Sequence, residues 1–249
     1  MAVSIDTLRH FFRVAFQNAQ WALSVDDFRA YKSQLSMLTY GEMIEESVEQ
    51  LLGWIELGEQ DVFYDLGCGL GRFMAHVYLR TSVRAVYGVE IAESRFRQAK
   101  RMLNALKSDP LLYDGRTIEL QKGDISEVCC SDATVVYMCS TCYPAELIKQ
   151  VVSNLQRDAQ VGLRVITLKR FSIPGRFRLI KQIELEMSWS QKSTVYLYRL
   201  EKDPPLPQHS IPASEDLSLL ATDEDSWESI DIEFDSSDFE NDSDESDSV

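Results

Sequence analysis

The most informative absence in the sequence is that of basic residues toward its carboxyl end. Residues 203–249 contain 16 aspartates and glutamates but no lysine or arginine, whereas the whole chain has 40 acidic and 25 basic residues. The remaining 24 acidic residues in 1–202 almost balance the 25 basic ones, although the net charge of the chain is −15. The acidity therefore belongs to one segment and does not describe the surface of the remainder.

Other absences narrow the class of protein. No apolar run is long enough to cross a bilayer and no secretory leader is evident, so neither membrane insertion nor export is expected. The five cysteines are an odd number, which favours free thiols in a reducing compartment, nucleus or cytoplasm. Cys139 and Cys142 have the spacing of half a zinc site, but no second Cys/His pair accompanies them, so no metal is expected.

From residue 44 onward, apolar residues alternate between helical and strand-like spacing. Five short apolar runs predict strands at residues 62–65, 85–90, 117–120, 134–138 and 163–167, with amphipathic helices between them. Two further runs, 177–189 and 194–200, predict an antiparallel hairpin at a sheet edge, joined by a short polar turn. The pattern indicates an α/β fold: a Rossmann-like sheet of seven strands with helices on both faces.

Three segments are predicted along the chain. Residues 1–37 form an N-terminal helical cover, with a capping box from Ser24 to Asp27 opening a helix that contains Phe28, Tyr31 and Leu35. Residues 38–201 form the α/β domain that carries the site. Residues 202–249 form an acidic tail with too little apolar surface to fold.

The predicted tail still contains a few large apolar residues. Ile230, Ile232 and Phe234 alternate with acids, so all three would project from one face of an extended segment. One interpretation is that this segment pairs with the edge of a partner's sheet and attracts a basic protein. An inert acidic spacer is the alternative.

A glycine loop follows the first predicted strand. The sequence Asp65-Leu66-Gly67-Cys68-Gly69-Leu70-Gly71 ends that strand and opens a helix, where glycines allow a sharp turn and close approach to a ligand. A dinucleotide fingerprint has different glycine spacing, and the carboxylate of Asp65 would repel a pyrophosphate. The carboxylate instead suits a cofactor that presents an ammonium group here.

Two further acids follow the next two strands. Glu90 ends the second strand, where it can accept hydrogen bonds from ribose hydroxyls, and Asp124 follows the third, where it can accept from an adenine amino group. The carboxyl ends of parallel strands line the ligand crevice of such folds. Together with the glycine loop, these acids predict S-adenosylmethionine as the cofactor, a purely structural turn being the alternative.

The glycine loop with Glu90 and Asp124 resembles class I S-adenosylmethionine-dependent methyltransferases. Residues 36–201 resemble one branch, the disruptor-of-telomeric-silencing family of histone-lysine methyltransferases. The resemblance rests on Thr39-Tyr40-Gly41-Glu42, on Tyr87-Gly88-Val89-Glu90 and on Ser188-Trp189-Ser190 with Tyr196. Lys169-Arg170-Phe171 also stands for the family's Lys-Pro-Phe.

This chain departs from the family at several positions. The segment Cys139-Ser140-Thr141-Cys142-Tyr143 stands where the family has Asn-Asn-Phe-Ala-Phe, and Gly123-Asp124-Ile125 stands for its Gly-Asp-Phe adenine motif. The acidic tail stands in place of a basic nucleosome-binding segment. Nucleosome specificity therefore does not follow from the resemblance.

The motifs and the resemblance together define two sets of candidate residues. The cofactor-binding set is Tyr40, Gly41, Glu42, Asp65, Gly67, Gly69, Gly71, Glu90, Asp124 and Ile125. The catalytic set, which would wall a channel for a neutral lysine and align it with the methyl group, is Tyr143, Ser140, Cys139, Trp189, Tyr196 and Phe171.

The favoured function is protein-lysine methylation of a basic, histone-like substrate. A small-molecule methyltransferase and a cofactor-binding adaptor with lapsed activity are the alternatives. Direct nucleic-acid binding is not favoured, because the basic run Arg95, Arg97, Lys100 and Arg101 is interpreted as a solvated helix face.

Overall fold

The computed structural model describes residues 2–17, 23–32, 35, 38–171 and 175–202, and all of these belong to one structural unit. The predicted acidic tail lies outside the described residues except for its first residue, Lys202. Its predicted lack of folding and its predicted pairing with a partner remain predictions.

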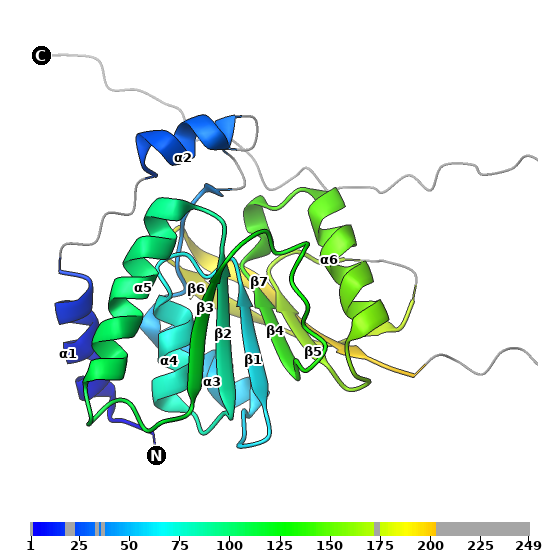
Figure 1. Cartoon of the computed structure of the whole chain (residues 1–249). Helices are drawn as coiled ribbons and strands as arrows, with labels where there is room; N and C mark the ends of the chain where they lie inside the picture. Colours follow the sequence, from blue (N-terminus) through cyan, green and yellow to red (C-terminus); the bar gives the residue numbers. More distant parts are fainter. Residues whose placement is uncertain (1, 18–22, 33–34, 36–37, 172–174, 203–249) are drawn as a thin grey trace, which may run out of the picture. The chain divides into compact units, whose positions relative to one another are not determined.

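One sheet of seven strands organises the described residues (Figure 1), in the order β3–β2–β1–β4–β5–β7–β6. Strands β1 to β5 run parallel, and β7 lies antiparallel to both β5 and β6. The predicted Rossmann-like fold and its antiparallel edge are thereby confirmed. The strands are β1 (Val62–Leu66), β2 (Ala85–Glu90), β3 (Thr117–Lys122), β4 (Val135–Met138), β5 (Arg164–Thr167), β6 (Phe177–Met187) and β7 (Ser190–Leu200).

The strand order reverses between β1 and β4. Successive crossovers run outward from β1 through β2 to β3, and the chain then returns to place β4 on the other side of β1. In open α/β sheets, the crevice at the carboxyl ends of the strands beside such a reversal is where ligands bind. The end of β1 is therefore the expected centre of the site.

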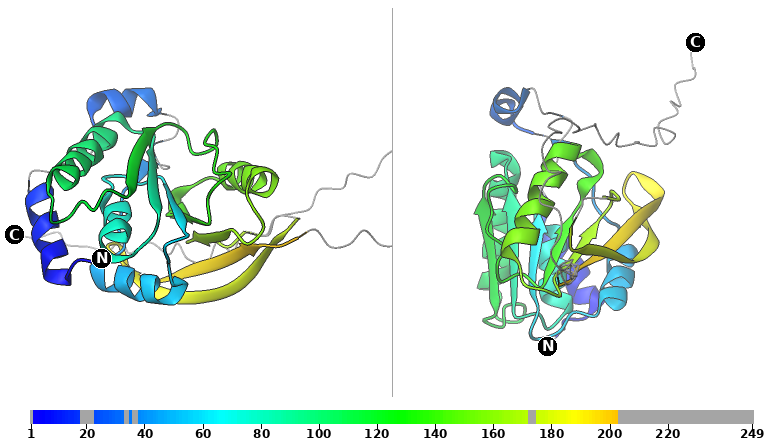
Figure 2. Two further views of the ribbon diagram at one scale, coloured as in Figure 1. Left: turned by 60° about the horizontal axis from the view of Figure 1, so that its bottom comes forward. Right: turned by 90° about the vertical axis from the view of Figure 1, so that its right-hand side faces the viewer.

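Helices cover both faces of the sheet (Figure 1), but unequally. Residues of α1, α3, α4 and α5 share one apolar core with one sheet face, and residues of α6 share a second core with the other face. Figure 2 shows α3 lying along the β6–β7 hairpin, and the two are in contact. The helices are α1 (Ile5–Ala15), α2 (Val25–Ala30), α3 (Glu45–Ile55), α4 (Arg72–Arg80), α5 (Glu93–Ser108) and α6 (Ala145–Asp158).

Helix α2 confirms the predicted capping box, and it buries an acidic residue while leaving an aromatic one exposed. Its Phe28 is 51% exposed, whereas Asp27 is buried. The reason is that the Asp27 carboxylate accepts hydrogen bonds from the backbone N–H groups of Glu93 and Ser94, at 2.8 and 3.1 Å, and so caps the start of α5. Burial alone would raise the pKa of Asp27, but these bonds and those from the Ser94 and Ser24 hydroxyls lower it to about 2.

The turn of the hairpin lies earlier than the sequence indicates. Met187 pairs with Ser190, so the turn consists of Ser188 and Trp189 and not of the polar residues 190–193. Met187 is buried and also forms an antiparallel bridge to Met43, which keeps β6 extended up to that residue. The consequence is that Trp189 lies at the tip of the hairpin.

Among the described residues, none of the helices combines the length and apolar character needed to cross a membrane.

Candidate active site

The glycine loop connects β1 to α4 with three left-handed backbone positions. The φ angles of Gly67, Gly69 and Gly71 are +88°, +56° and +77°, a region that residues with a Cβ rarely adopt. A methyl group at Gly67 would collide with the Tyr143 hydroxyl, and one at Gly69 would collide with the Tyr40 ring. Two tyrosines from distant segments therefore lie directly against the loop, which only glycine permits.

Two buried carboxyl groups lie beside the loop. Glu90 accepts hydrogen bonds from the backbone N–H groups of Gly69 and Ala92, both at 2.8 Å. Asp65, at the end of β1, is 2% exposed. Burial, with the nearby Glu90 charge, raises the pKa of Asp65 to about 8, and burial also raises the pKa of Glu90.

This carboxyl pair fits the predicted cofactor. Among the described residues, neither Asp65 nor Glu90 takes part in an ion pair, and the raised pKa of each carboxyl reflects the cost of holding its negative charge in a low-dielectric site. The ammonium group of S-adenosylmethionine would supply the missing positive charge at Asp65, and its ribose hydroxyls could donate to Glu90. The glycine loop leaves room for such a ligand to approach the backbone closely.

The turn after β3 lies beside Glu90. The N–H of Gly123 donates to the carbonyl oxygen of Glu90 at 3.1 Å. One carboxylate oxygen of Asp124 accepts from both the N–H and the hydroxyl of Ser126, each at 2.8 Å. The structure thus brings Gly123, the neighbour of Asp124, against Glu90, and the buried Ile125 follows Asp124. The predicted contact of these residues with adenine stays a prediction.

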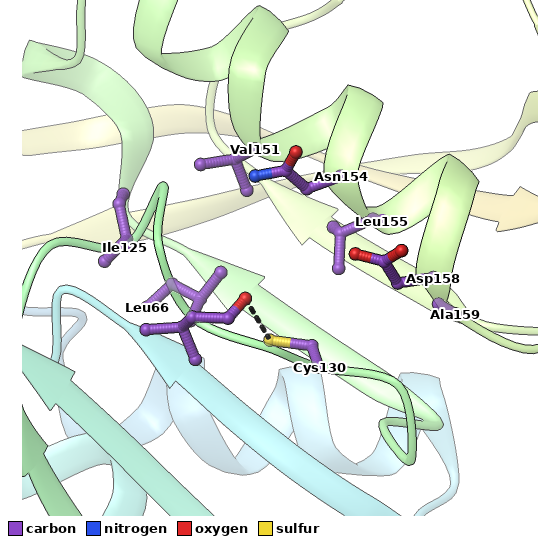
Figure 3. Close-up of a pocket in the computed structure, with 9 residues that line it drawn as sticks. Leu66, Ile125, Cys130, Val151, Asn154, Leu155, Asp158 and Ala159 are labelled. Atoms are coloured by element: carbon purple, nitrogen blue, oxygen red, sulfur yellow. Dashed lines mark hydrogen bonds between the residues drawn. The ribbon is translucent and has the colours of Figure 1, made fainter.

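A small pocket lies behind this turn (Figure 3). It is bounded by α6 and by the segment that leads from Ile125 to Cys130, and Leu66 of β1 forms its floor. Asn154 of α6, which lines the pocket, donates to the carbonyl oxygen of Ser126 at 2.7 Å. The pocket therefore supports the adenine-side turn from the α6 face and contains none of the residues assigned to catalysis.

The segment before α3 lies over the glycine loop. The Tyr40 hydroxyl donates a hydrogen bond to the Glu42 carboxylate. The guanidinium group of Arg95 lies 4.9 Å from the centre of the Tyr40 ring and donates to the carbonyl oxygen of Leu38 at 2.6 Å. We call residues 38–43 the cofactor loop.

Arg95 corrects one interpretation of the sequence. It was expected on a solvated helix face with Arg97, Lys100 and Arg101, yet it is only 5% exposed. The other three residues of that run are exposed. Arg95 lies inward because its position on α5 directs it under the cofactor loop. There its guanidinium group packs on the Tyr40 ring and donates a hydrogen bond to the Leu38 carbonyl oxygen.

The tip of the β6–β7 hairpin docks on the cofactor loop. The Glu42 N–H donates to the Ser188 hydroxyl at 3.0 Å, and the Ser188 N–H donates to the Glu42 carbonyl oxygen at 2.8 Å. A methyl group at Gly41 would collide with the Trp189 ring, so this indole lies flush against the loop. Trp189 nonetheless remains 43% exposed, so it can also meet a second molecule.

Tyr143 and Cys139 lie at the end of β4, close to the acids. The Tyr143 hydroxyl donates to the Leu66 carbonyl oxygen at 3.1 Å, and the Lys169 ammonium donates to the Tyr143 carbonyl oxygen at 3.0 Å. Burial raises the pKa of the Tyr143 hydroxyl, and burial with the Asp65 charge raises the pKa of Cys139 to about 12. Both groups are therefore protonated at neutral pH.

Ser140, Tyr196 and Phe171 lie farther along the acceptor side. Ser140 is fully buried, and its hydroxyl bonds to Thr167 at 2.6 Å and accepts from the Lys169 N–H at 2.9 Å. Tyr196 pairs with Thr167 in the sheet. These bonds favour a role for Ser140 in joining the ends of β4 and β5, and its predicted contact with the methyl group stays a prediction.

Phe171 lies in the core on the α6 side. Its ring stacks on Tyr198 at 3.9 Å between centroids, and its N–H donates to the Tyr198 hydroxyl at 3.1 Å. This arrangement favours a packing role for Phe171. Its predicted place in the wall of a channel also stays a prediction.

Some residues of the site carried no signal that the sequence analysis used. Arg72 directly follows the glycine loop and forms an ion pair with Glu42 at 3.0 Å. Ser188 was noticed only as part of a motif, and its contact with Glu42 spans 146 positions of sequence. The adjacency of Arg72 to Gly71 could have drawn attention to it, whereas nothing local predicts the contact of Ser188.

The cysteines and the other potential metal ligands of the described residues are dispersed. The described residues contain no cluster of three or more His, Cys, Asp or Glu side chains that could hold an ion, and all five cysteines are free thiols.

Comparison with known proteins agrees with the geometry. Residues 19–202 match the family model of the histone methylation protein DOT1. The chain is 32% identical over 154 residues to a protein-lysine N-methyltransferase of Saccharolobus islandicus, covering 62% of this chain and 88% of that protein. It is 25% identical over 146 residues to a histone-lysine N-methyltransferase, H3 lysine-79 specific, of Caenorhabditis elegans, covering 56% of this chain and only 15% of the nematode protein.

A solved structure supports the fold. The crystal structure of an RNA methyltransferase from Salinibacter ruber in complex with S-adenosyl-L-homocysteine aligns with a TM-score of 0.50 at 24% identity, over 65% of this chain and 95% of that one. Together with the seven-stranded sheet, the glycine loop and the two buried acids beside it, the matches leave one conclusion. The chain belongs to the histone methylation protein DOT1 family and is an S-adenosylmethionine-dependent methyltransferase.

Proposed function

We propose that the chain transfers the methyl group of S-adenosylmethionine to a lysine side chain of a protein substrate. The observation that carries this proposal is the position of Trp189, an exposed indole seated on Gly41 of the cofactor loop. An exposed aromatic residue at this border suits a long side chain that is delivered by a macromolecule. A small molecule would favour an enclosed pocket.

The chemistry of the proposed reaction needs few groups. When bound, the cofactor supplies a methyl group on a sulfonium, and its transfer to an amine is an in-line displacement. Holding the two reactants in line can lower the barrier by about 7–11 kcal/mol. Aromatic walls exclude water, which favours the neutral form of lysine, and they attract the methylammonium product by cation–π contact.

Tyr143 and Trp189 are the residues to which we assign these tasks. Tyr143 touches the glycine loop and lies within the field of Asp65 and Glu90, so it borders the cofactor directly. Trp189 is distant in sequence from the cofactor loop, but its ring lies against Gly41 of that loop. Cys139 and Tyr196 would contribute to the same wall.

The names of the relatives support a protein substrate. The archaeal relative, matched over most of its length, is named a protein-lysine N-methyltransferase, and the nematode relative is named specific for a histone lysine. A basic protein also suits a chain whose residues 203–249 carry 16 acids and no base, since such a segment attracts basic partners over a Debye length of about 10 Å.

The test is a labelling experiment with the full chain. The purified protein is incubated with S-adenosylmethionine labelled in the methyl group and either core histones or a cell extract. Label recovered as methyllysine in a protein supports the proposal. Label only in small molecules would overturn it in favour of a small-molecule methyltransferase, and binding of cofactor without any label would favour an adaptor that has lost activity.

A pair of variants makes this test specific for the site. Trp189→Ala should reduce protein methylation about five- to thirtyfold, the effect of losing one well-placed aromatic contact of about 1–2 kcal/mol, while cofactor affinity changes little. Phe28→Ala is the control, because Phe28 is an exposed aromatic residue on α2, outside both the glycine loop and the hairpin. Equal losses in the two variants would remove Trp189 from the acceptor side.

A further inference from the structure

Helix α1 lies outside the part of the chain that matches the family. The match begins at residue 19, whereas α1 spans Ile5–Ala15. It packs against α4 and α5, and its Leu8, Phe11 and Phe12 are buried. A helix that only filled a gap in the core would have no reason to contact a residue of the cofactor site.

Helix α1 does contact such a residue. The guanidinium carbon of Arg72 lies 4.4 Å from the centre of the Phe16 ring and 5.2 Å from that of Phe12. Arg72 is the first residue of α4 and directly follows Gly71, so its backbone is fixed by the glycine loop. Its Nε lies 3.0 Å from the Glu42 carboxylate.

Glu42 in turn fixes the cofactor loop from three directions. Its carboxylate receives the Tyr40 hydroxyl and the Arg72 charge, and its backbone is held by Ser188. Tyr40 then lies across Gly69. A chain of contacts therefore leads from Phe12 and Phe16 through Arg72 and Glu42 to the ring that covers the glycine loop.

The helix itself is held firmly enough to serve as a support. The Val3 N–H donates to the Leu79 carbonyl oxygen at 2.9 Å, and Arg80 donates to the Val3 carbonyl oxygen at 2.5 Å, which ties the start of α1 to the end of α4. Arg9 forms an ion pair with Glu45 of α3 at 2.6 Å. These contacts join α1 to α3, which follows the cofactor loop, and to α4, which follows the glycine loop.

We propose that α1 contributes to cofactor binding, and that Phe12 and the C-cap residue Phe16 are positioning residues. Their rings hold the Arg72 guanidinium group in the orientation that pairs it with Glu42. An arginine side chain has many rotamers, and a flat cation stacked on two rings loses most of that freedom before the ligand arrives. The proposal concerns cofactor binding alone and stands whether the methyl acceptor is a protein or a small molecule.

The test compares two leucine substitutions on one helix in the full-length protein. Phe16→Leu keeps an apolar side chain but removes the ring from Arg72. Phe11→Leu makes the same change at a buried position of α1 for which no contact with Arg72 is observed in the described residues. Dissociation constants for S-adenosylmethionine and S-adenosylhomocysteine are measured by calorimetry, and thermal unfolding of the free protein is measured alongside.

The expected result is a split between the two variants. Phe16→Leu should weaken binding about three- to tenfold, the size of one cation–π contact, while Phe11→Leu leaves binding within about twofold of the parent even if it lowers the melting temperature more. Equal weakening in both would mean that α1 acts only through stability, and unchanged binding in Phe16→Leu would remove α1 from the site. Either result overturns the proposal.

A double-mutant cycle tests the route of the effect. Arg72→Gln removes the cation, so Phe16→Leu should add no further loss of affinity in that background if the ring acts through Arg72. Phe12→Leu, combined with Arg72→Gln in the same way, should behave alike. Full additivity of the two losses would show that the rings reach the cofactor by another route and would overturn the assignment of Arg72.

Discussion

The two halves of the active-site edge are built in different ways. On the β1–β2–β3 side, Gly69 and Glu90 are joined by a hydrogen bond across 21 positions of sequence, and each acid lies at the end of its own strand or just after it. On the β4–β5–β7 side, the residues that would meet the acceptor come from the end of β4 and from the hairpin tip. There, Ser188 meets Glu42 across 146 positions.

This difference concerns what each half can tolerate. In the cofactor half, backbone conformation and two buried acids define the site, so few substitutions fit. In the acceptor half, the side chains of Trp189 and Tyr143 pack against glycines of the cofactor half. They can be substituted without disturbing the strand order. The expected effects of substitution on cofactor binding should therefore be largest at the glycine loop and smallest at the hairpin tip.

The largest effect is expected at the glycine loop. Gly69→Arg would place a side chain where φ is +56° and where the Tyr40 ring already lies, so cofactor binding should be lost below detection by calorimetry. Gly53→Arg is the control, because Gly53 lies on α3 with no atom near its missing Cβ. Binding that survives in Gly69→Arg would move the cofactor away from this loop.

The next effect is expected at the end of β2. Glu90→Gln keeps the side-chain shape and an oxygen for the Gly69 N–H, but it removes the charge that would accept from ribose. Cofactor binding should weaken by about 1.5–3 kcal/mol, the range for hydrogen bonds to a charged group. Glu93→Gln, three residues on, changes an acid paired with Arg97 on the surface and should leave affinity unchanged. If Glu90→Gln weakens cofactor binding by less than about 0.3 kcal/mol, the ribose does not bind at Glu90.

The same contrast explains what the sequence could predict. The succession of strands and helices along the chain, the glycine loop and the capping box of Ser24 with Asp27 depend on neighbouring residues, and the structure has all three. Hydrophobic period and turn chemistry act over a few positions, and they determine these features before any tertiary contact forms.

Features that depend on contacts between distant residues could not be predicted from the sequence. Arg95 was read from its charge and its helix, and only the return of the cofactor loop above α5 buries it. The hairpin turn was placed at polar residues, but the bridge from Met187 to Met43 holds β6 extended to its end.

A third and smaller effect should appear in the pH dependence. Burial beside Glu90 raises the pKa of Asp65 from 3.8 to about 8, so in the free protein this carboxyl is largely protonated at pH 6. An ammonium ligand binds the ionised form best, so affinity for S-adenosylmethionine should rise as pH increases from 6 to 7.5, by at most about tenfold per unit. Asp65→Asn should bind weakly at every pH and abolish this dependence.

The free protein should show the opposite trend in stability. Because the folded-state pKa of Asp65 lies above its unfolded value, its contribution is fully present below about pH 4 and is lost as pH rises through about 8. Thermal unfolding between pH 6 and 9 should therefore show Asp65→Asn gaining on the parent as pH increases. A constant difference between the two proteins would mean that Asp65 does not titrate in this range.

The smallest effect is expected where the two halves meet, at the hairpin tip. Ser188→Ala removes the acceptor for the Glu42 N–H but keeps the backbone bond from the Ser188 N–H to the Glu42 carbonyl oxygen. The free energy that holds the hairpin tip on the cofactor loop should fall by about 0.5–1.5 kcal/mol, the net value of one ordinary hydrogen bond. Because Arg72 and Tyr40 still hold the Glu42 side chain, cofactor affinity should change by less than about twofold.

Hydrogen exchange can detect so small a change without an acceptor. If the tip docks on the cofactor loop in solution, amides of residues 41–43 and 186–190 should exchange about two- to tenfold faster in Ser188→Ala, since local opening becomes easier by the energy of the lost bond. Ser190→Ala is the matched control, because the Ser190 hydroxyl bonds only within β7, to the backbone of Lys192 among the described residues. In Ser190→Ala, the amides of residues 41–43 and 186–190 should exchange as fast as in the parent protein. Faster exchange of the hairpin alone, with the cofactor loop unaffected, would mean that the two halves of the site are joined by Trp189 and Gly41 and not by this hydrogen bond.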